Sequence, residues 1–166
     1  PRLRVSEWAD EHRYLPETSA EPGRWRTSRA PYLREIMDAC SDHEVERVVF
    51  MKASQVGYSE ALLNILGYYV DQDPAPILVV QISIGEAAKF SKERVAPLIQ
   101  DCPVLREKVV ARKSRDSGNT IEAKKFRGGH LGIVGANAPS GLRSRARRII
   151  LFDEVDGFPA SAGEEG

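Results

Sequence analysis

The stretch that decides the fold reads Val48-Val49-Phe50-Met51-Lys52-Ala53-Ser54-Gln55-Val56-Gly57-Tyr58-Ser59. An apolar, β-branched run ends at Lys52, a short loop with Gly57 follows, and a helical pattern begins at Tyr58. The order strand, loop, helix brings unpaired helix-start amides and the Ser59 hydroxyl to one point, which suits a phosphate group. We therefore expect a buried strand over residues 46–51, followed by a phosphate-binding loop.

The loop matches the phosphate-binding pattern G-x-x-x-x-G-K-[ST] only in part. Gly57 and Ser59 fall in place, but Lys52 occupies the first Gly position and Tyr58 occupies the Lys position. A lysine at the start of the loop still has the length and flexibility to bring its ammonium group over the phosphates. Taken alone, the loop is also compatible with a plain strand-to-helix connection that needs a glycine.

Composition narrows the class of protein. The 166 residues are enough for one domain with a sizeable core, and 42% hydrophobic with 29% charged residues is ordinary for a soluble α/β protein. The 24 Lys and Arg residues balance the 24 Asp and Glu residues, so net charge gives no sign of nucleic-acid binding. Cys40 and Cys102 lie far apart and belong to no metal-binding motif, which argues against a disulfide framework. No run approaches the roughly 18 apolar residues of a membrane span, so we expect an intracellular protein without a membrane partner.

Strand and helix patterns alternate along the chain, which predicts an α/β fold with a mostly parallel sheet flanked by helices. Residues 1–31 read as an irregular N-terminal arm, in which we expect Trp8 to pack over a core. Helices are predicted near residues 6–13, 32–39, 58–70 and 84–100, and strands near 46–51, 77–82, 120–126, 130–134 and 148–152. The runs at 120–126 and 130–134 have the spacing of a hairpin.

A second apolar strand, Ile149-Ile150-Leu151-Phe152, ends in the adjacent acids Asp153 and Glu154. In an open α/β sheet the carboxyl ends of the strands share an edge with the phosphate loop. Asp153 and the Ser59 hydroxyl are suited to hold Mg²⁺, and Glu154 is suited to activate an attacking water. Acids also commonly end strands because they solvate well, but the two half-signals together favour a nucleotide site.

The segment Lys52–Ser59 resembles the deviant phosphate loop of tailed-phage terminase large subunits, particularly the lambda-like packaging ATPases, whose basic residue lies at the start of the loop. Further segments resemble the same family in the same order: Tyr32-Leu33-Arg34-Glu35-Ile36-Met37-Asp38, Ser140-Gly141-Leu142-Arg143-Ser144 and Leu151-Phe152-Asp153-Glu154-Val155-Asp156. The resemblance covers nearly the whole chain. It implies a P-loop NTPase fold of the additional-strand, conserved-glutamate, RecA-like type, with residues 1–31 as an arm on the adenine side and residues 32–166 as the ATPase core.

The resemblance also implies a role for each site residue. Lys52 would bind the β- and γ-phosphates, Glu154 would activate water, and Arg143 would stabilise charge in the transition state. Ser59 and Asp153 would bind Mg²⁺. The implied nucleotide-binding set is Lys52, Ala53, Ser54, Gln55, Val56, Gly57, Tyr58 and Ser59, with Trp25 or Tyr32 stacked on adenine.

In function, the resemblance implies hydrolysis of ATP with Mg²⁺ to drive double-stranded DNA into a procapsid in the host cytoplasm. The implied partners are a terminase small subunit, the portal and further copies of the chain, and the implied parent protein carries a C-terminal nuclease. A DEAD-like helicase or translocase is an alternative that the acidic run Asp153–Asp156 would suit, although its loop needs Gly-Lys-Thr. A degenerate nucleotide fold used only in assembly is another. Because the coupling strand of such motors has no counterpart after the acidic pair, we expect weak or absent ATP turnover by these 166 residues alone.

Overall fold

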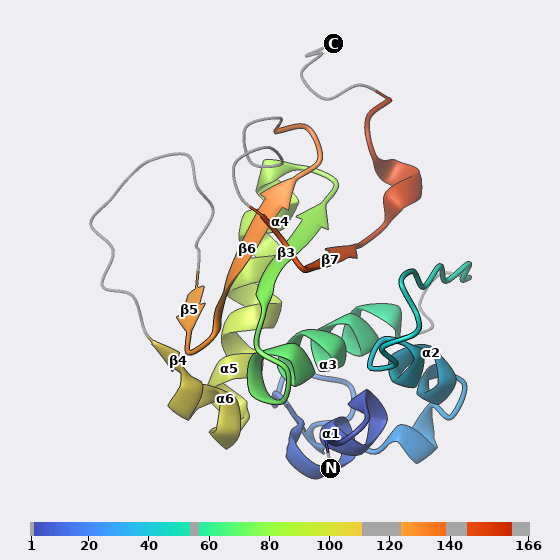
Figure 1. Ribbon diagram of the computed structural model, residues 1–166, viewed down its shortest axis with the longest axis vertical. Helices are drawn as coiled ribbons and strands as arrows, with labels where there is room; N and C mark the ends of the chain where they lie inside the picture. The colour runs from blue at the N-terminus through green and yellow to red at the C-terminus, as the bar shows by residue number, and fades with distance from the viewer. Residues whose placement is uncertain (1, 54–56, 111–123, 139–145, 161–166) are drawn as a thin grey trace. The chain divides into compact units, whose positions relative to one another are not determined.

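The computed structural model describes residues 2–53, 57–110, 124–138 and 146–160 (Figure 1). The chain divides into two compact units. Unit 1 comprises Pro1–Asp73 and Pro97–Arg106, and unit 2 comprises Pro74–Ala96 and Glu107–Gly166.

Unit 1 is built on three helices that contact one another in pairs: α1 (Val5–His12), α2 (Leu33–Ala39) and α3 (Tyr58–Asp71) (Figure 1). Every residue of α3 from Ala61 to Asp71 is buried, as expected of a helix that is apolar around most of its circumference. The helices predicted near residues 6–13, 32–39 and 58–70 are therefore confirmed. Trp8 is fully buried, as predicted for the N-terminal arm.

Short elements complete unit 1. β1 (Tyr14–Leu15) and β2 (Gly23–Arg24) pair as a two-stranded antiparallel ribbon, and a 3₁₀ turn, η1, covers Thr27–Arg29. Two further short helices lie later in the chain, α5 (Ala96–Asp101) and α6 (Pro103–Lys108). Leu98 of α5 and Leu105 of α6 are buried.

The prediction of a strand over residues 46–51 is wrong. The backbone from residue 45 to residue 53 carries neither helix nor strand, and the side chains of Val49 and Met51 are 83% and 96% exposed. A β-branched run forms a strand only where a neighbouring strand offers its hydrogen-bonding edge. No pairing between described strands includes these residues.

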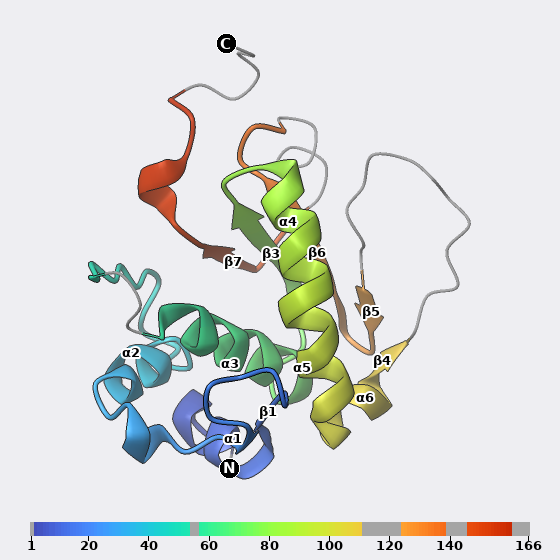
Figure 2. The same cartoon turned by 180° about the vertical axis from the view of Figure 1, so that it is seen from behind.

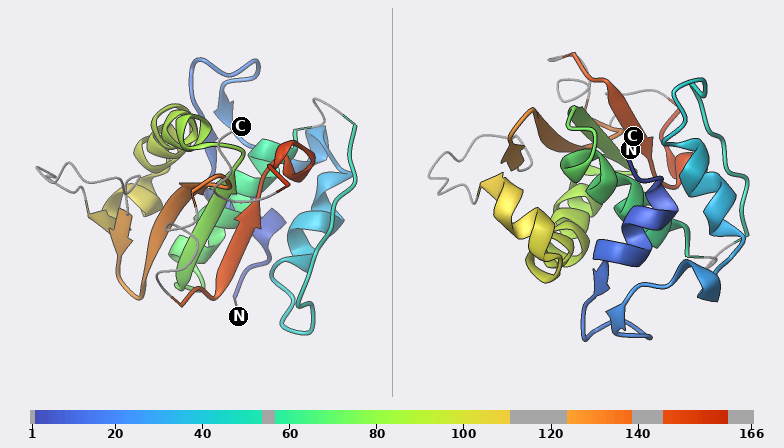
Figure 3. Two further views of the ribbon diagram at one scale, coloured as in Figure 1. Left: turned by 90° about the horizontal axis from the view of Figure 1, so that it is seen from above. Right: turned by 60° about the horizontal axis from the view of Figure 1, so that its bottom comes forward.

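Unit 2 contains a five-stranded sheet in the order β4-β5-β6-β3-β7. The strands are β3 (Pro76–Gln81), β4 (Val109–Val110), β5 (Lys124–Phe126), β6 (Gly129–Gly135) and β7 (Ile149–Phe152). The central strand β3 is buried from Ile77 to Gln81, which agrees with the continuous apolar run predicted to lie inside a sheet. Figure 3 shows β6, β3 and β7 side by side.

The sheet is mixed. β3 runs parallel to β6 and to β7, with Leu78 opposite Gly132 on one side and Ile150 on the other. β5 pairs antiparallel with both β4 and β6, so the predicted hairpin is confirmed over Lys124–Gly135. The α/β class is confirmed, whereas the mostly parallel character of the sheet is not.

The helix predicted over residues 84–100 is confirmed as three consecutive segments: α4 (Ile84–Phe90), a π-helical turn η2 (Ser91–Val95) and α5. The Ser83 hydroxyl begins α4 by accepting a hydrogen bond from the Glu86 amide at 3.2 Å. α4 packs against β3 and β6 (Figure 2), and its own residues Ala87 and Phe90 are buried.

Both cysteines are free thiols. Burial raises the pKa of the Cys40 thiol to about 11 and also raises the pKa of Cys102, so both stay protonated and weakly nucleophilic at neutral pH. Among the helices of the described ranges, none combines the length and apolar character that crossing a membrane requires.

Candidate functional site

The phosphate-loop candidate lies in unit 1 and is described at both of its ends. Lys52 and Ala53 precede it, and Ser54, Gln55 and Val56 lie outside the described residues. Gly57 is the residue before the first turn of α3 and has φ of +77°, a left-handed conformation that glycine adopts without steric cost. The helix therefore begins with Tyr58 and Ser59, so the Ser59 hydroxyl lies in its first turn.

Lys52 contacts the first residue of α3. Its Nζ lies over the Tyr58 ring, 5.5 Å from the ring centroid, and the same ring packs at a tilt on Phe50 with centroids 5.7 Å apart. An ammonium group is attracted to the face of an aromatic ring, so this contact orients the lysine. The charge of Lys52 is thereby held beside the residue that stands where the usual pattern has its lysine.

The two aromatic residues named for adenine differ in surroundings. The Trp25 ring is buried, and its Nε1 donates to Thr27 Oγ1 at 3.1 Å. The Tyr32 side chain is 56% exposed at the start of α2. Its neighbour Leu33 is close to the loop, because a Cβ built on Gly57 would lie 3.7 Å from Leu33 Cδ1. Tyr32 thus offers an exposed ring on the residue that precedes Leu33, the neighbour of Gly57.

The acidic pair lies in unit 2, directly after β7. The Asp153 amide donates to Val80 O at 3.1 Å, which extends the β7–β3 ladder by one hydrogen bond. Asp153 is buried, with an exposed fraction of 5%. Asp153 Oδ2 accepts a hydrogen bond from Gln81 Nε2 at 3.4 Å. Asp153 Oδ1 is buried, and no group in the described part of the chain donates to it. A buried carboxylate oxygen without a donor is costly unless a cation or water meets it, so this residue fits a Mg²⁺ ligand.

Glu154 is held in an unusual backbone conformation. With φ of +51° and ψ of +50°, it is the only non-glycine residue with positive φ in the ranges that the structure describes. A left-handed conformation costs an L-residue roughly 1–2 kcal/mol, and such strained residues cluster at functional sites. The strain lies directly beside Asp153, and the Glu154 side chain is exposed.

Sequence reasoning missed Gln81 as a site residue. It ends the buried strand β3 and is itself 6% exposed. The available signal was a polar residue that interrupts an apolar run at the carboxyl end of a strand, where ligands of α/β sheets bind. Arg143, the predicted transition-state arginine, lies outside the described residues.

The donor set suits a hard cation that keeps most of its water. Within the described ranges, no group of three or more His, Cys, Asp or Glu side chains gathers as a metal site. Mg²⁺ is usually held by one or two protein oxygens together with water and substrate phosphates, so a single buried carboxylate such as Asp153 is adequate for it.

Comparison with known proteins finds one family model and curated relatives that match the chain. The sequence model of the family described as "Phage terminase large subunit gpA, ATPase domain" matches residues 19–166. The terminase large subunit of Enterobacteria phage P21 is 32% identical over 99% of this chain, and that of Escherichia phage lambda is 33% identical over 96% of it. The chain covers 26% and 25% of those two relatives, about a quarter of their length. No solved structure matches the chain significantly.

Proposed function

The chain belongs to the family of phage terminase large subunit gpA ATPase domains, and from this premise we propose that it binds ATP with Mg²⁺ and hydrolyses it to drive DNA packaging. The family favours this function over the DEAD-like helicase considered above. Because the chain spans about a quarter of its relatives, the activity of the whole protein is part of the proposal.

The observation that carries the proposal is the carboxylate of Asp153. It is buried at the carboxyl end of β7, one oxygen is bound by Gln81, and the other has no donor among the described residues. Removing a charged group from water without a partner is strongly unfavourable, so the arrangement supports a cation as the missing partner. When bound, Mg²⁺ would neutralise charge on the β- and γ-phosphate oxygens.

Other residues of the chain are proposed to bind the phosphates, to bind Mg²⁺ and to accept a proton from the attacking water. Lys52 places its ammonium group on the phosphates, and the Ser59 hydroxyl is the second protein oxygen proposed for Mg²⁺. Glu154 accepts a proton of the attacking water as the water oxygen bonds to the γ-phosphorus and the bond from that phosphorus to the β,γ-bridging oxygen breaks, which releases ADP and phosphate. Its exposed carboxylate at a fixed, strained backbone position is suited to hold a water in one orientation.

We propose that the adenine ring stacks on Tyr32, whose ring is exposed, rather than on Trp25, whose ring is buried. Arg143 keeps its proposed role in stabilising transition-state charge on the strength of the sequence resemblance. The proposed partners are double-stranded DNA, a terminase small subunit, the portal of a procapsid and further copies of the chain, all in the host cytoplasm. The P-loop, additional-strand subtype of the fold and the separate C-terminal nuclease belong to the same proposal.

The test compares Glu154→Gln and Lys52→Ala in the whole large subunit proposed to contain this chain, with Asp156→Asn as an acidic control two residues further on. We expect Glu154→Gln to bind ATP normally and to lose at least about a hundredfold in kcat, which is the usual contribution of a general base. Lys52→Ala is expected to weaken ATP binding, and Asp156→Asn is expected to change neither. ATP binding is followed by fluorescence of a labelled nucleotide and turnover by phosphate release.

Unchanged hydrolysis by Glu154→Gln would overturn the role of this residue. Absence of ATP binding by the unmodified protein would favour the degenerate fold used only in assembly.

A further inference from the structure

We propose that Arg13 is a positioning residue of the phosphate site, acting through Glu60 on the first turn of α3. The inference rests on the proposed function, because it assigns Arg13 to the same ATP site. Neither residue belongs to the phosphate-loop pattern, and Arg13 lies in the N-terminal arm, far from the loop in sequence.

Arg13 and Glu60 form a partly buried ion pair, in which the Glu60 side chain is 22% exposed. The Arg13 side chain follows α1 directly and is 1% exposed, and its Nη2 lies 2.8 Å from Glu60 Oε2. The Nη1 group donates to the backbone oxygen of Tyr14. A guanidinium group so completely removed from water is tolerated only while it is paired, so Arg13 and Glu60 hold each other in one geometry.

Glu60 directly follows Ser59, the residue proposed as a Mg²⁺ ligand. Its amide donates to Gly57 O at 3.1 Å, so Glu60 belongs to the same first turn of α3 as Ser59. A charged hydrogen bond is directional, so it adds an angular restraint to the packing of this end of the helix. The Arg13–Glu60 pair therefore restrains the first turn of α3, which also carries Ser59.

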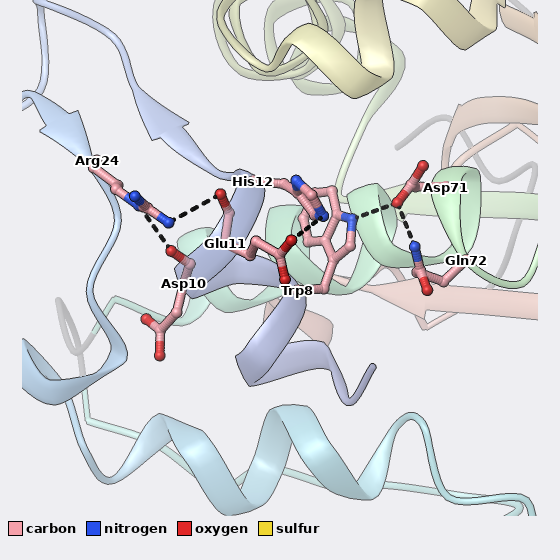
Figure 4. Close-up of polar contacts among 7 residues, drawn as sticks. All are labelled: Trp8, Asp10, Glu11, His12, Arg24, Asp71 and Gln72. Atoms are coloured by element: carbon pink, nitrogen blue, oxygen red, sulfur yellow. Dashed lines mark hydrogen bonds and ion pairs between the residues drawn. The ribbon is translucent and has the colours of Figure 1, made fainter. Parts of the chain in front are cut away.

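A second contact fixes α1 to the far end of α3. Trp8 Nε1 donates to Asp71 Oδ2 at 2.9 Å, and Gln72 Nε2 donates to the same oxygen at 2.7 Å (Figure 4). The Trp8 ring also lies on Gly67, where an added Cβ would be 2.2 Å from Trp8 Cη2. Glu60 and Asp71 are separated by roughly 16 Å along a helix that rises 1.5 Å per residue, so α1 contacts α3 near both ends.

The helix α1 is itself held in shape. Arg24 donates to the backbone oxygens of Asp10 and Glu11, at 2.9 and 3.2 Å, and so satisfies carbonyl groups at the C-terminal end of α1 (Figure 4). The Thr27 amide donates to Asp10 Oδ1 at 2.5 Å. An eight-residue helix would fray in isolation, and these contacts make it a fixed support for Arg13.

The experiment separates positioning from general stability by comparing variants at the two ends of α3, made in the whole large subunit proposed to contain this chain. Arg13→Met removes the contact beside Ser59, and Trp8→Phe removes the hydrogen bond to Asp71 at the other end. For each variant, kcat and KM for ATP are measured as Mg²⁺ is varied, together with the melting temperature.

We expect Arg13→Met to lower kcat/KM for ATP by about tenfold and to raise the half-saturating Mg²⁺ concentration, because small displacements of reacting groups are costly. Trp8→Phe is expected to lower the melting temperature without changing the Mg²⁺ dependence. Glu60→Gln keeps an acceptor for Arg13 but no charge, and an intermediate effect on Mg²⁺ dependence is expected.

The inference is overturned if Arg13→Met changes only the melting temperature, or if Trp8→Phe shifts the Mg²⁺ dependence as much as Arg13→Met does. If Arg13→Met does not fold, Glu60→Gln decides, and a wild-type Mg²⁺ dependence in that variant rejects the role. Ser59→Ala separates this inference from the proposed function. If Ser59→Ala leaves the Mg²⁺ dependence unchanged, the assignment of Ser59 as a metal ligand is wrong. If Ser59→Ala shifts the Mg²⁺ dependence but the Arg13 and Glu60 variants do not, only the positioning role of Arg13 fails.

Discussion

The side-chain amide of Gln81 donates to Asp153 Oδ2 across 3.4 Å, at the carboxyl ends of the neighbouring strands β3 and β7. Both side chains are buried, so the contact is protected from water. The hydrogen bond is made to one carboxylate oxygen, and Oδ1, which has no donor among the described residues, is the oxygen proposed to bind Mg²⁺. Partners of this kind orient metal ligands and contribute strongly to metal affinity.

Gln81→Leu is therefore expected to raise the Mg²⁺ concentration needed for half-maximal ATP turnover by about tenfold, within the range seen when partners of metal ligands are removed. The exposed Gln100 offers a matched control, and Gln100→Leu is expected to behave as the unmodified protein. A Mg²⁺ titration of phosphate release checks both. An unchanged midpoint for Gln81→Leu would show that Asp153 does not depend on this amide.

The ring of Tyr58 is expected to contribute to nucleotide affinity by orienting Lys52. Tyr58→Phe keeps an aromatic face for the ammonium group, and Tyr58→Leu removes it. At an exposed site such a contact is worth about 0.5–1 kcal/mol, so Tyr58→Leu should weaken ATP binding by roughly two- to fivefold. Equal affinities for the Phe and Leu variants, measured with a fluorescent nucleotide, would argue against the cation–π contact.

Gly67→Ala is expected to destabilise the protein by about 1–3 kcal/mol, because the new methyl group overlaps the buried Trp8 ring. Gly85→Ala is the matched helical control. A Cβ at Gly85 would meet only Ser83 Oγ at 3.8 Å, so this change should be neutral or stabilise by up to about 1 kcal/mol. Urea denaturation of the two variants checks the difference, and equal midpoints would contradict it.

Glu154→Gly is expected to abolish ATP hydrolysis and to raise the free energy of unfolding. Glycine accepts the positive φ at this position, so relief of strain should raise the free energy of unfolding by up to about 1 kcal/mol while hydrolysis is lost. Glu154→Gln should lose hydrolysis without that gain, since it keeps the strained backbone. Thermal unfolding alongside phosphate release distinguishes them. Loss of stability in Glu154→Gly would show that the left-handed conformation is not costly here.

Most helices could be predicted because their apolar residues recur at helical spacing, and the central strand of unit 2 could be predicted because it is a short, continuous apolar run. The apolar run that became β3 is buried along nearly all of its length, and α3 is buried over its last eleven residues, Ala61–Asp71. The run at 46–51 has the same local character as β3 yet forms no strand. Strand formation depends on a partner edge elsewhere in the chain, which local composition does not contain.

For the candidate site, sequence order and residue type were enough to name Lys52, Ser59, Asp153 and Glu154 as proposed participants. They were not enough to identify Gln81 or Arg13, whose interest comes from what they contact rather than from a motif. The choice between Trp25 and Tyr32 likewise needed their burial. Side-chain partners in three dimensions have no counterpart in the spacing of residues along the chain.

The exposed segment before the phosphate loop has a consequence for how the protein behaves in solution. Val49 and Met51 present apolar side chains to water in a β-prone stretch that has no strand partner among the described residues. Such stretches are templates for edge-to-edge association between molecules. Glu46 and Arg47, both exposed, precede the stretch with opposite charges, a placement expected to disfavour such association.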